Sequence, residues 1–498
     1  MSLSTVLSRA QCGIDAPLVR VETHISNGMP AFSIVGLPAA AVRESKDRVR
    51  SAILNSHLAF PTQRLTVNLA PADLPKEGGR FDLPIALSIL AATNQLSKTA
   101  LDQVEFIGEL ALNGDLRPVS GGVSAALAAT KMQRSIVMPL SNSRLAAAVP
   151  GARVLPAGQL LELLAHLQGE HSLEYANAEL QEADCEYPDL AEAHGQAAAK
   201  RALEITAAGG HNLLFFGPPG TGKTMLASRL PGILPPLRKA EILEILALQS
   251  VVNPTADSSG GLRRPFRAPH HSATTAALVG GGRQLRPGEI SQAHCGVLFL
   301  DELLEFPRPA LEALREPMES AWVRISRASG NVAYPARFQL VAAMNPCPCG
   351  YLGDQQLECR CTPGQVQKYR QRLSGPLLDR IALLLQLPRL PASALLDSAP
   401  RGETSAQVRL RVCAARQLQI ERAGVINSLL NDRQIRKYCY LRESEKKLLE
   451  QAMESLGLSA RACHRVLKVS RTIADLDGSD GIGRRHLLEA LGYRQFDR

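Results

Sequence analysis

An eight-residue segment constrains the fold of this 498-residue chain more than any other part of it. The segment matches the phosphate-binding pattern G-x4-GK[ST] in full and consists of Gly217, Pro218, Pro219, Gly220, Thr221, Gly222, Lys223 and Thr224. The apolar run 213–216 before it is typical of a buried strand, and a helix-forming run follows it. In such a loop, backbone N–H groups and the start of the helix hold phosphate oxygens. We therefore expect ATP to bind here, with Lys223 on the β- and γ-phosphates and the Thr224 hydroxyl on Mg²⁺.

Two further apolar runs end in polar side chains that suit ATP hydrolysis. The run 297–300 ends at Asp301 and Glu302, and the run 338–344 ends at Asn345. In an open α/β sheet, ligands bind at the carboxyl ends of the strands. We expect Asp301 to bind Mg²⁺, Glu302 to polarise the attacking water, and Asn345 to orient that water, the role called sensor 1. Ordinary surface acids and a turn asparagine are the alternatives.

The order of apolar and helical patterns predicts an α/β chain of several domains. Strands expected at 212–216, 297–300 and 339–342 alternate with helices, which is typical of a parallel sheet covered by helices. Further elements are expected as strands at 65–69 and 104–110 and as helices at 41–55, 193–208, 406–422, 444–455, 460–476 and 484–491. The predicted domains are an N-terminal α+β domain (1–169), an acidic linker (170–192), an ATPase core (193–390) and a helical lid domain (391–498).

The charge and the amino-acid composition of the chain indicate which kinds of molecule it could bind. The formal net charge is +9, and the 45% hydrophobic and 21% charged residues exclude a disordered chain. Residues 1–169 hold 15 basic and 12 acidic residues, and 170–192 hold eight acids and no Lys or Arg, so 193–498 carry an excess of +14. Aromatic residues make up only 4%, so a nucleic acid would be held through its phosphates more than by base stacking. No apolar run is long enough to span a membrane and no export signal is present, so we expect a cytoplasmic protein without membrane contact.

Two acid-free segments carry clustered arginines. The first is 263–288, and the second is 323–334, in which two short β-like runs predict a hairpin. Such loops suit the gripping of DNA phosphates without reading of bases, whereas ordinary solvated loops are the alternative. The expected DNA contacts are Arg267, Arg283, Arg286, Arg324 and Arg327. The adjacent His270 and His271 are interpreted as loop structure or a phosphate contact, because neighbouring histidines rarely share a metal ion.

Four of the ten cysteines cluster as two C-x-C pairs, Cys347 with Cys349 and Cys359 with Cys361. Four thiolates are enough for a closed tetrahedral Zn²⁺ site, although C-x-C is tighter than the usual C-x2-C spacing. Scattered buried thiols are the alternative. We expect zinc here, where it would hold the loop after Asn345.

Five sequence blocks together resemble one family. They are GPPGTGKT (217–224), GVLFLDEL (296–303), MNPCPCG (344–350), SGPLLDRI (374–381) and SARACHRVLKVSRTIADL (459–476). Over essentially its whole length, the chain resembles the magnesium-chelatase-like branch of the AAA+ ATPases and, within it, the ComM/YifB group. The resemblance implies a P-loop core with a helical lid, assembled as a ring, usually a hexamer, with ATP sites between subunits.

The resemblance also implies roles for two arginines. Arg380 matches the arginine finger, which reaches the γ-phosphate of a neighbouring subunit, with Arg370 and Arg372 as rivals. An ion pair of Arg380 with Asp379 or another acid of the same subunit is the alternative. Arg461 matches sensor 2, which projects from the lid onto the bound nucleotide; a solvated helix arginine is the alternative.

The N-terminal domain resembles the proteolytic domain of Lon, which has a ribosomal S5-type fold. Its segments 71–86 and 108–122 carry the likeness, but Arg80 stands where the nucleophilic Ser would be. The run 120–126 contains no Lys for a Ser–Lys dyad. We therefore expect the fold without proteolysis.

The resemblance implies a branch-migration helicase that promotes integration of transforming DNA by homologous recombination. The residues alone strongly indicate an ATPase, and the positive charge of residues 193–498 favours DNA as the molecule on which it acts. Two other classes remain open at this stage: the ATPase subunit of a magnesium chelatase and an AAA+ protein unfoldase.

Overall fold

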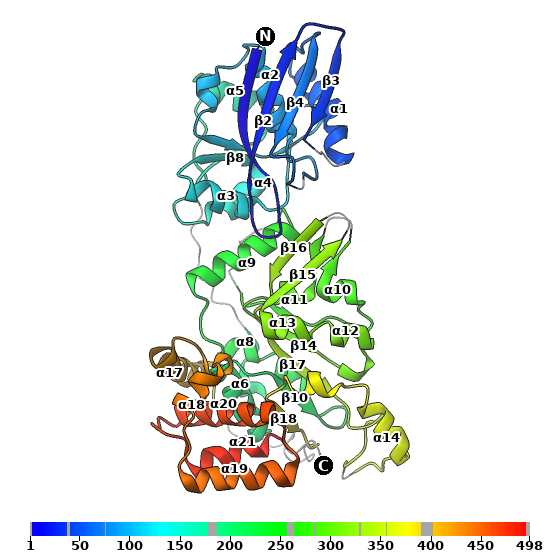
Figure 1. Cartoon of the computed structure of the whole chain (residues 1–498), viewed down its shortest axis with the longest axis vertical. Helices are drawn as coiled ribbons and strands as arrows, with labels where there is room; N and C mark the ends of the chain where they lie inside the picture. The colour runs from blue at the N-terminus through cyan, green and yellow to red at the C-terminus, as the bar shows by residue number, and fades with distance from the viewer. Residues whose placement is uncertain are drawn as a thin grey trace.

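A computed structural model of the protein describes residues 2–36, 40–74, 76–177, 187–255, 263–282, 285–327, 330–354, 356–389 and 402–494. Three parts follow one another along the long axis of the molecule (Figure 1). The N-terminal part lies at one end, a β-sheet module lies in the middle, and helices of the C-terminal part pack at the other end. Among the described residues, no helix is both long and apolar enough to cross a membrane.

The N-terminal part is a seven-stranded mixed sheet with the strand order β3-β4-β2-β1-β5-β8-β9. Its strands are β1 (Ser2–Arg9), β2 (Leu18–Ser26), β3 (Ala31–Val35), β4 (Arg64–Ala70), β5 (Val104–Phe106), β8 (Ser135–Pro139) and β9 (Arg153–Ala157). Its helices are α1 (Ala40–Asn55), α2 (Asp82–Ala92), α3 (Gly122–Lys131), α4 (Leu140–Ala147) and α5 (Leu160–Leu167). Helix α2 is buried along its whole length, so it forms the centre of this core.

The strand expected at 104–110 is divided in the structure. β5 ends at Phe106, and β6 (Glu109–Leu110) pairs instead with β7 (Leu116–Arg117). The cause is Gly108, whose N–H donates to Arg80 O and whose O accepts from Leu83 N–H. These bonds draw the chain out of the sheet toward the start of α2.

The middle module is a five-stranded parallel sheet with the order β11-β14-β17-β10-β18. Its strands are β10 (Leu213–Phe216), β11 (Phe266–Arg267), β14 (Val297–Leu300), β17 (Gln339–Met344) and β18 (Leu383–Gln386). The three central strands are fully buried, as expected of a parallel sheet covered on both faces. The predicted α/β class with an S5-type domain before a parallel AAA+ core is thereby confirmed.

The C-terminal part is helical, with α17 (Ser405–Ala423), α18 (Asp432–Tyr438), α19 (Glu443–Leu456), α20 (Ala460–Leu476) and α21 (Arg484–Gly492). The four predicted helices are present, whereas α18 was not predicted. Alternate residues of β10 face different cores. Leu213 and Phe215 pack in one cluster with Val469 and Ile473 of α20, so the helices and the sheet share a core. Leu214 packs in the cluster on the other face.

The remaining helices and strands lie between the elements already named, mostly within one of the three parts. They are η1 (Lys98–Leu101), η2 (Leu190–Glu192), α6 (Ala197–Gly209), α7 (Lys223–Ala227), α8 (Leu230–Ile233), α9 (Lys239–Val252), α10 (Thr275–Val279), β12 (Gly280–Gly281), β13 (Arg286–Pro287), α11 (Glu289–Gln292), η4 (Leu303–Glu305), α12 (Arg308–Glu312), α13 (Arg315–Ser320), β15 (Trp322–Arg327), β16 (Gly330–Pro335), α14 (Pro363–Arg370), α15 (Gly375–Leu378) and η5 (Asn427–Leu429). The helix expected at 193–208 thus begins four residues later, at Ala197.

The N-terminal part is packed against α9 of the middle module. Leu246 and Ala247 of α9 belong to one apolar cluster with α3 and α4. Gly121 N–H donates to Ser250 O at 2.8 Å, and Asn142 Nδ2 donates to Pro254 O at 2.8 Å. Apolar burial and these two bonds fasten the N-terminal part to the module that carries the P-loop.

Candidate nucleotide site and basic hairpins

The phosphate-binding loop joins β10 to α7. Gly220 and Gly222 have φ angles of +79° and +82°, a left-handed conformation that favours glycine and turns the loop back on itself. The Lys223 side chain is buried, and its Nζ donates to Gly217 O at 2.8 Å and Pro218 O at 2.9 Å. Burial lowers the pKa of Lys223, while Asp301 and Glu302 act to raise it. The ammonium group is thus held inside the loop, where a phosphate chain would lie.

The hydroxyl and carboxylate expected to bind Mg²⁺ lie side by side. Thr224 Oγ1 donates to Asp301 Oδ2 at 2.6 Å, although the two residues come from different strand ends. Both are hard oxygen ligands of the kind Mg²⁺ takes together with water and phosphate oxygens. The residues therefore fit Mg²⁺ together with ATP.

Asn345 lies next to the P-loop lysine. β17 lies between β10 and β14, so its carboxyl end is adjacent to both the P-loop and the acids. Asn345 Oδ1 accepts from Lys223 Nζ at 3.2 Å. The structure thus brings together Lys223, Thr224, Asp301 and Asn345, as the sequence predicted for this end of the sheet.

Glu302 contacts a residue to which the sequence gave no role in hydrolysis. Its backbone φ is +49°, and its Oε2 lies 3.1 Å from Nδ1 of His271. His271 comes from the loop after β11, the strand that pairs with β14. No local sequence signal points to this contact, because it depends on β11 lying beside β14.

Arg380 lies at the opposite end of the sheet from the P-loop. β18 is parallel to β10, with Leu213 paired to Leu383, so Arg380 comes before the start of its strand. Asn212, which precedes β10, donates to Arg380 O at 3.0 Å. A strand of this length spans about 13 Å, which separates Arg380 from the P-loop of its own chain.

The Arg380 side chain is occupied within the subunit. Its side chain is 9% exposed and forms an ion pair with Glu319, so in the single subunit the alternative of a pair with another acid of the same chain is observed. Its Nη1 also donates to Pro376 O at 2.6 Å. The rival Arg372 donates to Leu304 O at 3.2 Å, close behind the Asp301–Glu302 pair, so it lies on the catalytic side of the sheet.

Arg461 is exposed in the first turn of α20. Arg465 also lies in α20, and its pKa is lowered to about 10 by burial and by the positive charges of Arg494, Arg380 and Arg461. The two arginines expected to contact nucleotide therefore share one region of the subunit.

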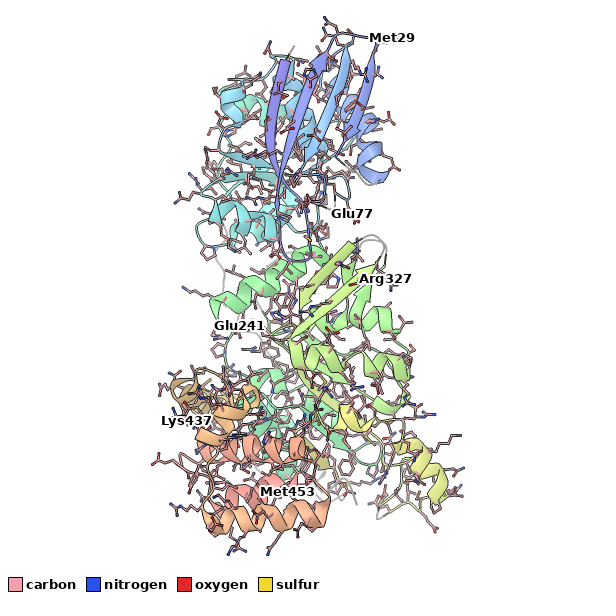
Figure 2. All side chains as sticks on the ribbon, in the orientation of Figure 1. Met29, Glu77, Glu241, Arg327, Lys437 and Met453 are labelled. Carbon is pink, nitrogen blue, oxygen red and sulfur yellow. The ribbon has the colours of Figure 1, made fainter. Side chains whose placement is uncertain are left out.

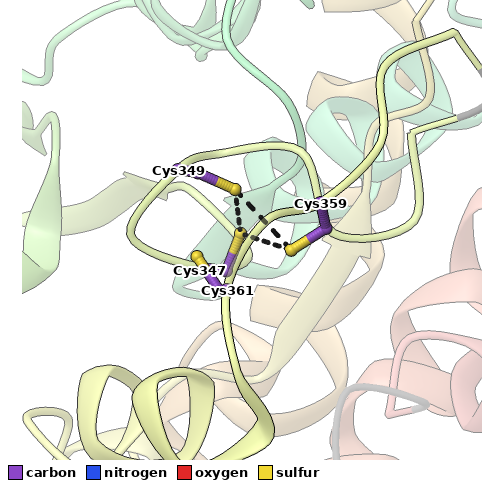
Figure 3. Close-up of side chains that lie close together, drawn as sticks. All are labelled: Cys347, Cys349, Cys359 and Cys361. Atoms are coloured by element: carbon purple, nitrogen blue, oxygen red, sulfur yellow. Dashed lines mark hydrogen bonds between the residues drawn. The ribbon is translucent and has the colours of Figure 1, made fainter.

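The four clustered cysteines converge (Figure 3). The Sγ atoms of Cys347, Cys349 and Cys359 lie 3.3–3.7 Å apart, and with Cys361 all four lie within 4.8 Å of one another. Zn–S bonds of about 2.3 Å in a tetrahedron place sulfurs about 3.8 Å apart. Backbone N–H groups of Tyr351 and Arg360 lower the pKa of Cys349 to about 6, which favours a thiolate. The four residues fit Zn²⁺.

This cysteine loop also touches the nucleotide site. A Cβ atom at Gly350 would lie 3.0 Å from Pro219 Cδ, so the loop packs directly on the P-loop.

A second close group, Glu244 with His294 and Cys295, has a different character. Arg337 forms an ion pair with Glu244, and a guanidinium at this point repels a metal ion. Burial raises the pKa of Cys295 to about 12, so its thiol stays protonated. We interpret this group as a structural network.

The two arginine-bearing segments form hairpins that pack on each other. β15 pairs with β16, as predicted, and β12 pairs with β13. Tyr334 OH donates to Leu285 O at 2.9 Å, and Leu285, Ile325 and Tyr334 share a core cluster. Residues 285–287 therefore pack against residues 322–327 and 330–335.

Three of the arginines predicted to contact DNA are exposed on these hairpins: Arg286, Arg324 and Arg327. Arg324 lies on the opposite face of β15 from Arg327, because side chains alternate along a strand. Figure 2 shows Arg327 on the side of the module that faces the N-terminal part. Arg283 lies outside the described residues. Arg267 differs from the prediction, because its Nε and Nη2 donate to Glu289 at 2.6 and 2.7 Å. This carboxylate neutralises Arg267 and raises its pKa, so we exclude Arg267 from the DNA surface.

The Lon-like segment of the N-terminal part holds buried cations. Arg80 is 4% exposed and donates to Ser120 O at 3.0 Å. Lys76 donates to Gly36 O at 2.9 Å and to two further backbone carbonyls. A guanidinium offers no nucleophile for peptide hydrolysis.

Fold and site define a class: a P-loop ATPase of the magnesium-chelatase type, with the P-loop, the acids and Asn345 at the carboxyl ends of adjacent parallel strands. The family "Magnesium chelatase, subunit ChlI" matches residues 189–395. "Subunit ChlI of Mg-chelatase" matches 21–142, and "Magnesium chelatase, subunit ChlI C-terminal" matches 402–494. Within this class, the chain belongs to the ComM/YifB family.

The assignment to the ComM/YifB family rests on relatives that match this chain over its full length. The chain is 52% identical over 504 residues to competence protein ComM of Haemophilus influenzae, covering 100% of this chain and 98% of ComM. It is 51% identical over 499 residues to uncharacterized protein YifB of Escherichia coli, with the same coverage. It is 24% identical over 287 residues to RuvB of Latilactobacillus sakei, a Holliday junction branch migration complex subunit, over 57% of this chain and 66% of RuvB.

Proposed function

We propose that this protein is an ATP-driven DNA motor that moves branched DNA during homologous recombination, and so promotes integration of transforming DNA. The observation that carries the proposal is the pair of packed hairpins with Arg286, Arg324 and Arg327 exposed, in the same module as the P-loop. Exposed cations on these hairpins suit a phosphate backbone, which gives affinity without sequence readout.

The relatives support this proposal through their names. One full-length relative is called a competence protein, and a more distant one is a subunit of a branch migration complex. The proposal for this chain includes binding to DNA and branch migration. It also includes a location in the cytoplasm, where DNA and ATP are both present.

The proposed active form is a homo-oligomeric ring, most simply a hexamer. Arg380 lies at the far end of the sheet from its own P-loop, and we propose that it exchanges its ion pair with Glu319 for a nucleotide bound by a neighbouring subunit. Arg461, in the same region, would act on that nucleotide as sensor 2. In this assembly Glu302 would polarise water and Asn345 would orient it, while the P-loop, with Thr224 and Asp301, would hold ATP and Mg²⁺. An arginine supplied in trans stabilises transition-state charge.

Zinc and the domain limits are further parts of the proposal. Zn²⁺ at Cys347, Cys349, Cys359 and Cys361 would fix the loop that packs on the P-loop. We retain the limits 1–169, 170–192, 193–390 and 391–498 for the N-terminal domain, linker, core and lid.

The test compares ATP hydrolysis with single-stranded, duplex and branched DNA. Stimulation by DNA, strongest with branched DNA, is expected. The second candidate is a magnesium chelatase subunit, which the matching family descriptions favour. Protoporphyrin with Mg²⁺ is therefore the parallel arm. Stimulation by porphyrin and none by any DNA would refute the DNA motor.

A further inference from the structure

Arg80 of the N-terminal part is a buried cation to which the proposed function gives no role. Its Nη2 donates to Ser120 O at 3.0 Å. Its Nε and Nη1 are also buried, and neither has a hydrogen-bond partner among the described residues. Burial lowers the pKa of Arg80 to about 10, so the group is still charged at neutral pH. The structure therefore holds a positive charge in its interior with most of its hydrogen bonds unmade, which is unfavourable.

No carboxylate in the described part of the chain neutralises this charge. Asp82, two residues further on, is fully buried, but its Oδ2 accepts from Arg48 Nε at 2.7 Å. Arg9, a second deeply buried arginine of the N-terminal part, shows the usual arrangement, because its Nε and Nη2 both donate to Glu105 at 2.6 Å. Buried charges are paired in this way because an isolated one is costly. Arg80 therefore lacks a counter-ion.

The Arg80 guanidinium lies at the start of helix α3, which has ten residues. Ser120, whose carbonyl it contacts, is two residues before Gly122, the first residue of α3. Within the residues that the structure describes, the N–H groups of Gly122, Val123 and Ser124 have no acceptor, and the buried Ser124 Oγ has no partner. A helix start carries about half a positive charge, and its N–H groups bind anions. Donors from two segments thus lie together without an acceptor for most of them.

This place lies at the junction with the middle module. Gly121 N–H donates to Ser250 O of α9 at 2.8 Å, and Ser120 Oγ donates to Gln11 Oε1 at 2.6 Å. Glu77, three residues before the buried guanidinium, lies at the end of the N-terminal part that faces the middle module (Figure 2). Ser120 is half-buried, whereas the first residues of α3 are buried. The position is therefore closed to a nucleotide or a peptide, and only a small solute fits it.

We propose that a small monovalent anion of the halide class, such as chloride, binds between Arg80 and the start of α3. The anion accepts hydrogen bonds from the guanidinium, from N–H groups of the first turn and from the Ser124 hydroxyl. One negative charge neutralises Arg80, whereas a phosphate dianion would leave a negative charge in the interior. Because Gly121 beside it donates to Ser250, the bound anion stabilises the contact between the N-terminal part and the module that carries the P-loop.

The first test is anomalous diffraction from crystals of the full-length chain in sodium bromide, because bromide replaces chloride and scatters anomalously. The expected result is a bromide peak within hydrogen-bond distance of Arg80 Nε or Nη1, and no such peak in Arg80→Met. A water molecule, a phosphate or no density at this place in the wild type would overturn the proposal. A bromide peak that persists in Arg80→Met would also overturn it, because Arg80 would then not hold the ion.

The second test is thermal unfolding of the full-length chain over a bromide series. Sodium gluconate keeps the ionic strength constant, and gluconate is too large for a buried site. Above the dissociation constant, each tenfold rise in bromide multiplies the folding equilibrium constant about tenfold, because the ion binds only the folded chain. The unfolding midpoint of the wild type should therefore rise with the logarithm of the bromide concentration. Arg80→Met should lose this response.

Two further variants make the second test specific. Ser124→Ala removes one hydroxyl and no charge, so it should weaken the bromide affinity about two- to tenfold. It also serves as the test if Arg80→Met does not fold. Arg416→Met is the matched control, because Nε and Nη2 of Arg416 both donate to Ala207 O and that guanidinium already has an acceptor. It should keep the bromide response.

Three outcomes of the second test overturn the proposal. They are a wild type that does not respond to bromide, an unchanged response in Arg80→Met or Ser124→Ala, and an equal loss of the response in Arg416→Met. Neither test uses ATP or DNA, so the anion site and the proposed DNA motor stand or fall separately.

Discussion

The salt dependence of DNA binding tests the basic hairpins most directly. Each phosphate contact contributes about −0.9 to the slope of log affinity against log salt concentration for duplex DNA. Arg286, Arg324 and Arg327 are exposed, so each subunit that engages DNA contributes a slope of about −2.7. A fourfold rise in salt concentration then lowers the affinity about 40-fold for each engaged subunit.

The perturbation is the double substitution Arg324→Ala with Arg327→Ala. Both residues lie on β15 and their side chains are exposed, so the hairpin core of Val323 and Ile325 stays intact. The slope is expected to fall to about −0.9 per engaged subunit, and the loss over the same salt range to about three- or fourfold.

The assay is fluorescence anisotropy with labelled duplex DNA over a salt series. The matched control removes two exposed arginines from the lid, Arg409 and Arg436. The control should keep the slope of the wild type. An unchanged slope in the hairpin variant, or an equal decrease in the control, would refute the placement of DNA on the hairpins. Basal ATP hydrolysis should remain in the hairpin variant and verifies its fold.

Three further predictions concern the nucleotide and cysteine sites. Glu302→Gln is expected to bind ATP normally and to hydrolyse it at least about a hundredfold more slowly, because the general base is lost; turnover like that of the wild type would contradict its role. Arg380→Ala is expected to lower turnover about a thousandfold or more if it acts on a neighbour's nucleotide. Mixing it with Lys223→Ala subunits should then restore part of the activity at hybrid sites, whereas no recovery on mixing would exclude action in trans. Metal analysis should find about one Zn²⁺ per chain and none after Cys347→Ser; absence of zinc from the unmodified protein would dismiss the site.

Much of the nucleotide site was predictable from short stretches of sequence. Lys223 and Thr224 belong to a motif whose function depends on the backbone of that same segment, and Asp301 and Asn345 directly follow buried apolar strands. For such residues, local spacing determines which strand end they occupy. The carboxyl ends of β14, β17 and β10, which lie in this order in the parallel sheet, then bring them together, and Thr224 Oγ1 lies 2.6 Å from Asp301 Oδ2.

Other features depend on which segments become neighbours, and the sequence does not encode that locally. Arg267 and Arg286 are equally arginines in an acid-free segment, but only Arg267 meets Glu289, just beyond that segment. The contact of His271 with Glu302 exists because β11 pairs with β14. The separation of Arg380 from its own P-loop exists because β18 runs parallel to β10.

The sequence by itself determined the chemistry of this protein: a phosphate-binding loop, two acids, four thiols and clustered cations at spacings that the chain keeps in any fold containing those elements. The tertiary structure alone decided where each charge acts. Strand order and helix packing set the distances between segments remote in the chain, and electrostatic interactions depend on those distances rather than on separation along the sequence.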